Sequence, residues 1–328
     1  MKKEIFFFVA LIAMGSTINA QEQATFQPSG KTIMRIFSNF NSEFTDGTTN
    51  SAFELERAYL GYQYEFTENF SSTVLFDITV PKNENSEFTL HVKNAYLNYK
   101  NQNLNVTFGM IPTLQVKLQE DFWGYRYLLK SHQDLSKMIS TADIGLSASY
   151  SIIEKIVAAD LSIINGETYK HIQADNNFKT AFGVTVHPIK DLTLRAVYDF
   201  MGTENAQTSF ISFIGYQFGK NTIAAEYNIQ QNVNYVPGKD YWGTSVYATL
   251  APFKNIEVFA RYDFLTSNTI NLETSNWNAS NDGRLIVAGV EYQPIKGLKI
   301  TPNYRLYDPS VASETNTHSI YMNVEVRF

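Results

Sequence analysis

Apolar and polar residues alternate with a period of two along most of this chain. In residues 256–264 the Glu, Arg and Asp side chains fall at one parity and most apolar side chains at the other. Residues 104–110, 192–200 and 320–328 alternate in the same way. Successive side chains of a β-strand point to opposite faces. The pattern therefore predicts an all-β chain whose strands each have one apolar face and one polar face.

Sixteen segments show this alternation. They are 30–40, 52–66, 70–80, 88–100, 104–111, 141–150, 156–165, 178–187, 191–200, 208–218, 221–231, 240–250, 256–265, 283–293, 298–307 and 317–328. A single-chain bacterial barrel needs an even number of strands if both of its ends lie on one side of the membrane. A mean hydropathy of −0.22 beside 44 % hydrophobic residues fits strands with two unlike faces, because the two faces cancel in the average.

The connections between the segments alternate between short and longer. Seven are tight and carry turn residues: 67–69, 101–103, 151–155, 188–190, 219–220, 251–255 and 294–297. Eight are mostly longer and polar: 41–51, 81–87, 112–140, 166–177, 201–207, 232–239, 266–282 and 308–316. Outer-membrane barrels have short periplasmic turns and longer external loops, whereas a soluble sandwich gives no reason for this alternation.

No later stretch approaches 18 consecutive apolar residues, so no transmembrane helix is expected after the N-terminal segment. Only helices and closed barrels satisfy their backbone groups inside lipid. We therefore predict a transmembrane antiparallel β-barrel of about 16 strands in contact with outer-membrane lipid. Residues 21–328 form one domain in this prediction.

Residues 1–20 have the pattern of a secretory signal peptide. Lys2 and Lys3 precede a ten-residue apolar stretch at 5–14, and small residues at 17–20 precede a cut before Gln21. The alternative is a buried N-terminal helix. Export together with the barrel pattern predicts the bacterial outer membrane as the location.

The composition excludes several classes of site. The chain has no cysteine, so disulfides, thiolate nucleophiles and Cys-ligated metals are excluded. Its net charge is −6 without a Lys/Arg block, which argues against nucleic-acid binding. The five His residues form no metal-ligand spacing and no nucleophile motif. His91, on a predicted strand, is the only one whose surroundings should be inspected for a Ser or Asp neighbour. We expect no metal, no cofactor and no enzyme activity.

If the apolar faces meet lipid, the polar faces line a lumen. The basic side chains predicted to point inward are Arg35, Arg57, Arg195, Arg261 and Arg305. The acidic ones are Asp77, Asp199, Glu226, Glu257, Asp263 and Glu291. The two sets nearly balance, so the wall alone predicts no strong ion preference. These charges either filter solutes or pair across neighbouring strands and hold the register.

The connection 112–140 is the longest and is unusually apolar. It contains Phe122, Trp123, Tyr125 and Tyr127, and apolar spacing further along predicts a short helix near 125–139. A loop of this composition is not expected to extend into solvent. We predict that it folds into the lumen and narrows it. The charged side chains predicted at this constriction are Lys117, Glu120, Asp121, Arg126, Lys130 and Asp134, with His132 and Lys137 nearby. The alternative is an external cap or a trimer contact.

Aromatic residues cluster near the ends of the segments, as in the interfacial girdles of barrels, although β-propensity alone also enriches strands in aromatics. Phe328 closes the final alternating strand. A C-terminal Phe on such a strand resembles the insertion signal that bacterial barrels present to the barrel-assembly machinery.

Residues 57–61 (RAYLG), Phe76-Asp77 and 108–113 (FGMIPT) resemble the porin superfamily that includes the phosphate-selective porins. Residues 123–126 (WGYR), Asp134-Leu135 and 142–146 (ADIGL) resemble porins of Bacteroidetes-type bacteria. The resemblance is densest over 52–150. It implies a sixteen-stranded, usually trimeric diffusion channel with its third loop inside the barrel. It does not imply phosphate, because phosphate selection needs a basic ladder that the near-balanced wall lacks.

The expected function is passive diffusion of small hydrophilic solutes and ions through a water-filled outer-membrane porin, assembled as a homotrimer. One alternative is a substrate-specific channel for an anion or a sugar, with the loop aromatics as a sliding track. The other is a non-conducting barrel that serves as an enzyme, adhesin or scaffold.

Overall fold

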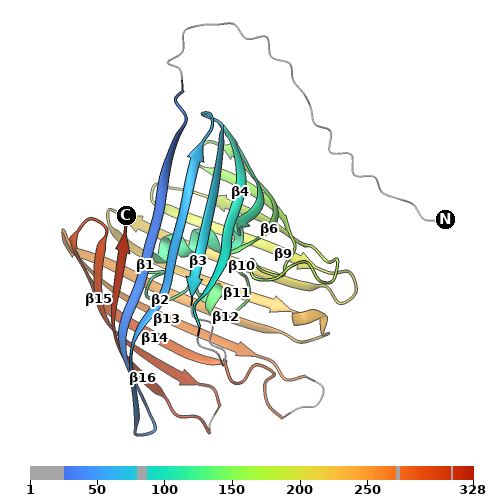
Figure 1. The fold of residues 1–328 in the computed structure, drawn as a ribbon. Coiled ribbons are helices and arrows are strands. Elements are labelled where there is room, and N and C mark those ends of the chain that lie inside the picture. The colour runs from blue at the N-terminus through green and yellow to red at the C-terminus, as the bar shows by residue number, and fades with distance from the viewer. Residues whose placement is uncertain (1–25, 80–86, 271–273, 312) are drawn as a thin grey trace, which may run out of the picture.

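The computed structural model describes residues 26–79, 87–270, 274–311 and 313–328. Over these ranges sixteen antiparallel strands form one closed barrel in which the first strand pairs with the last (Figure 1). The fold class predicted from the alternation is confirmed. The predicted signal peptide 1–20 lies outside the described residues.

The strands follow one another around the barrel in chain order. The first eight are β1 Ser29–Thr45, β2 Thr48–Glu65, β3 Phe70–Thr79, β4 Thr89–Asn101, β5 Leu104–Pro112, β6 Ala142–Ile153, β7 Val157–Ile164 and β8 Lys179–Val186. The last eight are β9 Leu192–Met201, β10 Gln207–Phe218, β11 Asn221–Gln231, β12 Tyr241–Phe253, β13 Ile256–Ser267, β14 Gly283–Ile295, β15 Leu298–Pro309 and β16 Thr317–Arg327. Because consecutive strands pair, each hairpin closes locally and the seam lies between β1 and β16.

The first connection differs from the prediction. Residues 41–51 were expected to form a polar loop, but β1 and β2 continue to a two-residue turn at Asp46-Gly47. Both turn residues have positive φ (50° and 74°), as a tight type I′ hairpin turn requires. An Asp-Gly pair is the sequence signal for this turn. It outweighs the polar composition that suggested a loop.

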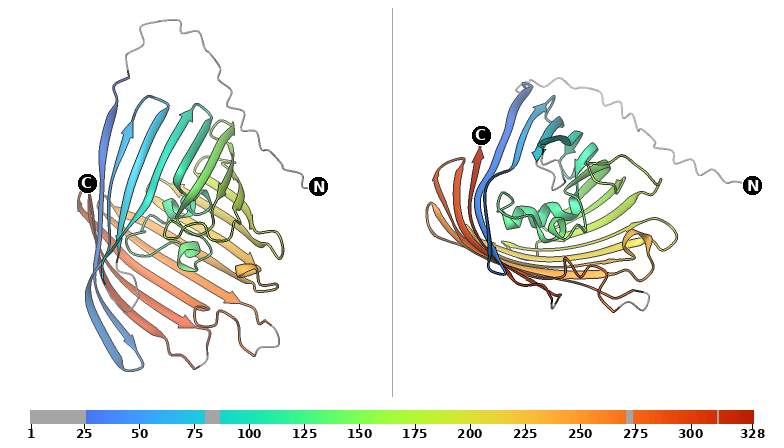
Figure 2. Two further views of the ribbon diagram at one scale, coloured as in Figure 1. Left: turned by 45° about the vertical axis from the view of Figure 1, so that its right-hand side comes forward. Right: turned by 60° about the horizontal axis from the view of Figure 1, so that its bottom comes forward.

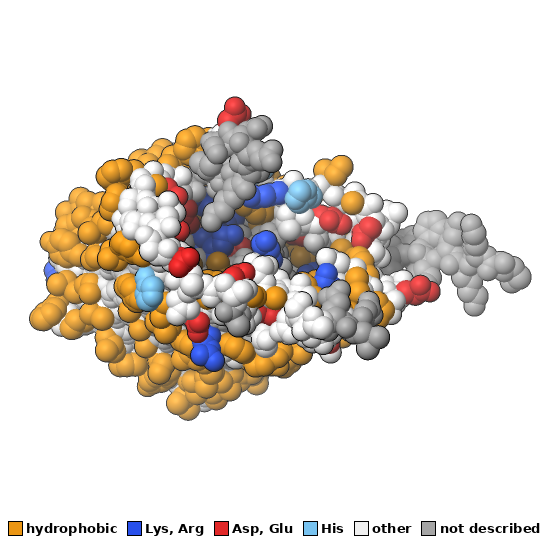
Figure 3. Space-filling model, turned by 90° about the horizontal axis from the view of Figure 1, so that it is seen from below, with side chains coloured by type: hydrophobic (Ala, Val, Ile, Leu, Met, Phe, Trp, Pro, Cys, Tyr) orange, Lys and Arg blue, Asp and Glu red, His pale blue; other side chains and the backbone are white. Residues whose placement is uncertain are grey.

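The barrel buries its polar side and exposes its apolar side. On β11, Glu226 and Asn228 are buried inside, whereas Ile223 and Tyr227 are exposed on the outer surface. Figure 3 shows hydrophobic side chains around the outside of the molecule and polar and charged ones in the hollow at the long-loop end. This arrangement fits a wall with lipid outside and water inside. No helix among the described residues has the length and apolarity needed to cross a membrane.

The connection between β5 and β6, residues 113–141, is called loop 3 below. It contains α1 Leu114–Trp123 and the single turn α2 His132–Leu135, and the long loop after β11 holds the 3₁₀ turn η1 Val233–Tyr235. The helix predicted near 125–139 is therefore misplaced. Gly124 adopts a left-handed conformation (φ 71°) and ends α1. The apolar residues after it pack in several directions instead of along one helical face.

Candidate functional site

Loop 3 lies inside the ring of strands, with both helices drawn in green within the barrel (Figure 2). Trp123 packs edge-on against Tyr247 of β12 and Phe259 of β13, with ring centroids 5.3 and 5.9 Å apart. Tyr127 meets Phe37 of β1 at 6.2 Å. These rings belong to one buried cluster that joins the loop to the inner wall. The aromatic side chains of loop 3 are thus a packing core between the loop and the wall.

Polar bonds fix the same contact. The Tyr125 hydroxyl donates to Glu257 at 2.9 Å, and the Tyr127 hydroxyl donates to Glu291 at 2.8 Å. Three wall arginines donate to loop carbonyls at 2.8–3.1 Å: Arg195 to Leu114, Arg261 to Lys130 and Arg305 to Leu128. The bonded strands are β9, β13, β14 and β15. Loop 3 starts at β5 and ends at β6, so it crosses the lumen to reach them.

Two glycines of the wall allow loop 3 to pack closely against it, and this contact is called the seat of the loop below. A Cβ added at Gly215 of β10 would lie 2.7 Å from Phe122 Cδ1, inside any carbon–carbon contact distance. A Cβ at Gly243 of β12 would lie 2.5 Å from His132 Cε1. His132 is held further by the Phe264 carbonyl at 3.2 Å and the Asn228 amide at 3.1 Å. Only residues without a side chain allow α1 and α2 to approach these strands so closely.

The charged residues predicted at the constriction pair with one another. Arg126 contacts Glu120 at 2.7 Å and Asp134 at 3.2 Å, and Lys130 contacts Asp134 at 3.4 Å. Burial alone would raise the pKa of the Asp134 carboxyl, but Arg126 and Lys130 outweigh it and the pKa lies below its ordinary value. The other two predicted residues, Lys117 and Asp121, form an ion pair on an exposed side of α1. The six residues therefore form two separate groups.

The wall residues predicted to point inward lie on the inner face. Three of the arginines pair with acids: Arg57 with Asp77 at 3.3 Å, Arg195 with Asp160 at 2.6 Å and Arg261 with Asp263 at 2.6 Å. Arg35 and Arg305 make no ion pair within the described ranges, and Arg305 stacks 3.6 Å over the Tyr321 ring. Only the first pair, Arg57 with Asp77, joins neighbouring strands, β2 and β3, because Arg195 on β9 reaches past β8 to Asp160 on β7, and Arg261 and Asp263 both lie on β13.

Sequence reasoning missed a buried cation on β4. Lys93 is 8 % exposed, donates to the Tyr59 hydroxyl at 3.1 Å and has no carboxylate within 4 Å in the described part of the chain. Its ammonium lies 4.9 Å from the ring centre of Tyr59 and 5.8 Å from that of Tyr169. Alternation with outward-facing Leu90 and Val92 was a usable signal for its direction. No pattern indicated Tyr169, which comes from the loop between β7 and β8.

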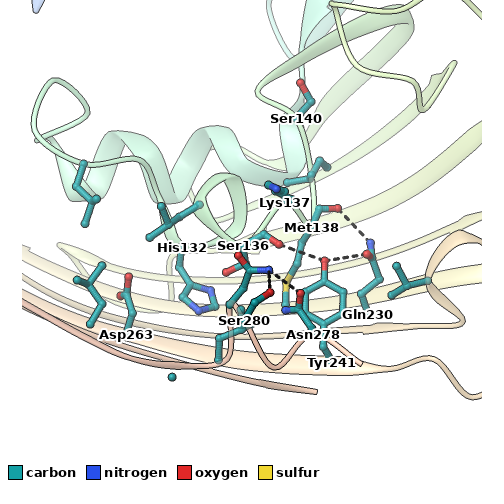
Figure 4. Close-up of a pocket in the computed structure, with 18 of the residues that line it drawn as sticks. His132, Ser136, Lys137, Met138, Ser140, Gln230, Tyr241, Asp263, Asn278 and Ser280 are labelled. Carbon is teal, nitrogen blue, oxygen red and sulfur yellow. Dashed lines mark hydrogen bonds between the residues drawn. The ribbon is translucent and has the colours of Figure 1, made fainter. Parts of the chain in front are cut away.

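The described part of the barrel has two cavities, one towards the long loops and one towards the short turns. The larger, about 800 Å³, opens towards the long loops and has loop 3 residues 135–140 in its lining (Figure 4). The smaller, about 500 Å³, lies near the short turns and is lined by residues of β2 to β7, including Gln63, Thr73 and Asn98. Lys93, Tyr59 and Asp77 occupy the inner face of these strands further towards the long loops. No group of three or more metal-ligating side chains occurs among the described residues.

The final residue sits at the barrel seam. The Phe328 amide donates to the Met34 carbonyl at 3.2 Å and its carbonyl accepts from the Met34 amide at 3.1 Å. Its side chain is exposed on the outside.

Comparison with solved structures gives barrels of the same fold. OmpF of Salmonella typhi, in complex with daunomycin, has a TM-score of 0.69 at 11 % identity over 90 % of this chain and 97 % of its own. An anion-selective porin from Comamonas acidovorans has a TM-score of 0.62 at 10 % identity over 92 % and 100 %. The outer membrane protein OmpT of Vibrio cholerae, in a trimer form, has 0.61 at 12 % identity over 92 % and 100 %. No family model and no curated protein matches the sequence.

Proposed function

We propose that this chain is a porin of the bacterial outer membrane through which small hydrophilic solutes and ions diffuse passively. The observation that carries the proposal is a closed barrel, apolar outside and polar inside, with one long connection seated in the lumen. A fixed polar path lets a solute follow its own gradient without any moving part. The fold shared with an anion-selective porin supports this role. The proposed role involves no catalysis and no cofactor.

Loop 3 sets the size limit in this proposal. Its seat is on β9 to β15, so the passage runs along the opposite wall, beside β2 to β7. Planar-bilayer recording of the reconstituted protein is expected to give stable, ohmic conductance steps, and a folded barrel without conductance would overturn the porin role. Deleting residues 117–138 is expected to raise conductance and to admit larger solutes. Unchanged conductance would place the passage away from the loop.

The six charged loop residues and the inward arginines are proposed to shape the electrostatics of this passage. Reversing Arg126 and Lys130 together is expected to shift ion selectivity towards cations, measured as a reversal potential in a salt gradient. The matched control comes from the other four residues: Lys117→Glu acts on the exposed side of α1 and is expected to shift the reversal potential less.

We also propose a homotrimer exported by the signal peptide 1–20 and inserted by the barrel-assembly machinery through the strand that ends at Phe328. The trimer form of the Vibrio cholerae barrel supports the oligomeric state. Chemical cross-linking in membranes tests the trimer, and a single band at the mass of the monomer would overturn it. Deleting Phe328 is expected to lower the yield of inserted barrel without changing conductance per channel.

The neutral-sugar alternative has less support. Phe122, Trp123, Tyr125 and Tyr127 are all at most 8 % exposed, so loop 3 offers no open aromatic face along which a sugar could slide. The Bacteroidetes-type and phosphate-selective resemblance remains a proposal about ancestry. Phosphate itself is not proposed as the solute, because three of the five predicted wall arginines are neutralised by acids.

A further inference from the structure

The larger cavity contains an apolar patch that a water-filled passage does not need. Met138, Val233, Tyr241 and Leu265 form a buried cluster, and Trp277 packs against it. All five line the cavity of about 800 Å³. Ligand sites typically have this size, with mostly apolar walls and a few placed polar groups. The aromatic cluster elsewhere on the inner wall packs against loop 3, whereas this patch borders a cavity.

The patch is rigid. The Tyr241 hydroxyl donates to Gln230 at 3.0 Å, and the Gln230 amide donates to the Met138 carbonyl at 3.1 Å (Figure 4). Trp277 meets the Tyr241 ring edge-on at 5.4 Å, and its indole N–H donates to the Asp240 carbonyl at 2.8 Å. A surface fixed in advance loses little entropy when it binds an apolar group.

The acidic side chains that line this cavity already accept hydrogen bonds from other groups of the protein. Glu43 accepts the Tyr321 hydroxyl at 2.8 Å, and Asp263 accepts two bonds from Arg261. The Asp143 carboxylate accepts three backbone N–H groups at 2.7–3.1 Å.

The Lys and Arg side chains that line the cavity have few carboxylate partners. Lys137, Lys179 and Arg305 make no ion pair with any described carboxylate, and Arg284 reaches Asp308 only at 3.8 Å between exposed side chains. Arg305 is held in place by its stacking on Tyr321 and its bond to the Leu128 carbonyl. Lys and Arg side chains are visible in the hollow at this end of the barrel (Figure 3). Four Lys and Arg side chains line the cavity against three acids, and one of these acids, Asp263, is paired with Arg261, so the net charge of the lining is positive.

We propose that this cavity binds an amphipathic organic anion, with an apolar or aromatic body on the Met138–Trp277 patch and a carboxylate towards Lys137 and Arg305. This inference rests on the proposed porin function in one respect only: the cavity is taken to lie on the long-loop side of the solute path. It makes the protein a channel that first concentrates one class of solute at its mouth. Small inorganic anions lack the body, and neutral apolar solutes lack the charge.

Intrinsic fluorescence of the refolded protein in detergent tests the site without requiring conductance. The chain has three Trp residues. The probe is 4-bromobenzoate, whose bromine quenches tryptophan on contact, with 4-bromobenzyl alcohol and bromide as the body-only and charge-only comparisons. Saturable quenching by the carboxylate is expected, and it should be lost in Trp277→Phe but kept in Trp242→Phe, which changes an outward-facing residue.

A charge variant and its control complete the test. Lys137→Met is expected to weaken binding about threefold, the effect of one exposed charge. Lys239→Met is the control, because the Lys239 ammonium lies 4.5 Å from the Trp277 ring centre but Lys239 does not line the cavity. This variant should bind 4-bromobenzoate as the unchanged protein does. Equal quenching by the alcohol, or quenching that survives Trp277→Phe, would overturn the site. Binding without conductance would instead overturn only the porin role.

Discussion

The seat of Phe122 on Gly215 predicts a strong coupling between two residues far apart in sequence. Gly215→Ala adds a Cβ that lies 2.7 Å from Phe122 Cδ1 and 2.7 Å from Phe213 Cζ. Carbon atoms in contact prefer about 3.5–4.0 Å, so the Phe122 ring must retreat by roughly 1 Å. Phe122 is buried against Phe213, with ring centroids 4.9 Å apart, so its ring can retreat only by moving its neighbours. Overpacking of this kind costs about 1–3 kcal/mol.

The coupling is measured by a double-mutant cycle in urea unfolding of the refolded barrel, followed by tryptophan fluorescence. In the Phe122→Ala background the Phe122 ring is gone and the Phe213 ring, which packs against it at 4.9 Å, can move into the vacated space, so Gly215→Ala is expected to cost much less. The coupling energy should therefore be most of the cost of about 1–3 kcal/mol seen in the wild-type background. The same cycle in single-channel recording should show an altered conductance for Gly215→Ala alone. Equal destabilisation by Gly215→Ala in both backgrounds would refute the packing of Phe122 against Gly215.

Three further outcomes follow from charges inside the barrel. Lys93→Met is expected to move the reversal potential towards cations, because it removes a buried ammonium that no described carboxylate neutralises. Arg195→Met is expected to cost up to about 3 kcal/mol in urea unfolding, since it leaves the partly buried Asp160 carboxylate without its partner. The lowered pKa of Asp134 means that its ion pairs stabilise the loop fully above the ordinary carboxyl pKa near 4 and lose this effect as pH falls below it. Conductance that does not change between pH 6 and pH 3 would count against this last outcome.

Alternation was sufficient to predict the strands because a barrel wall obeys one local rule along its whole length. The predicted 221–231 coincides with β11, and 256–265 differs from β13 only at its end. The same rule placed Arg57, Arg195 and Arg261 on the inner face. Their partners were less accessible: Asp160 sits on β7 and Arg195 on β9, so the pair depends on a register that no single segment reveals.

Loop 3 was harder to predict because tertiary packing, not periodicity, decides its conformation. The spacing of Tyr127, Leu128 and Met138 suggested one helical face, but Tyr127 packs towards β1 and β14 while Met138 faces the cavity beside Tyr241. Gly215 and Gly243 carried no signal as single glycines in strands. Their role becomes visible only when α1 and α2 are placed against them.

Loop 3 also has a mechanical consequence for the barrel. It leaves the wall at β5, crosses the lumen and is bonded to β9, β13, β14 and β15 before it returns to β6. It therefore acts as an internal strut that ties opposite walls together and resists flattening of the cross-section under lateral pressure from the membrane. A loop-deleted barrel would lose stiffness as well as an obstruction. Its current should be noisier as well as larger, and the two changes report different properties of the same segment.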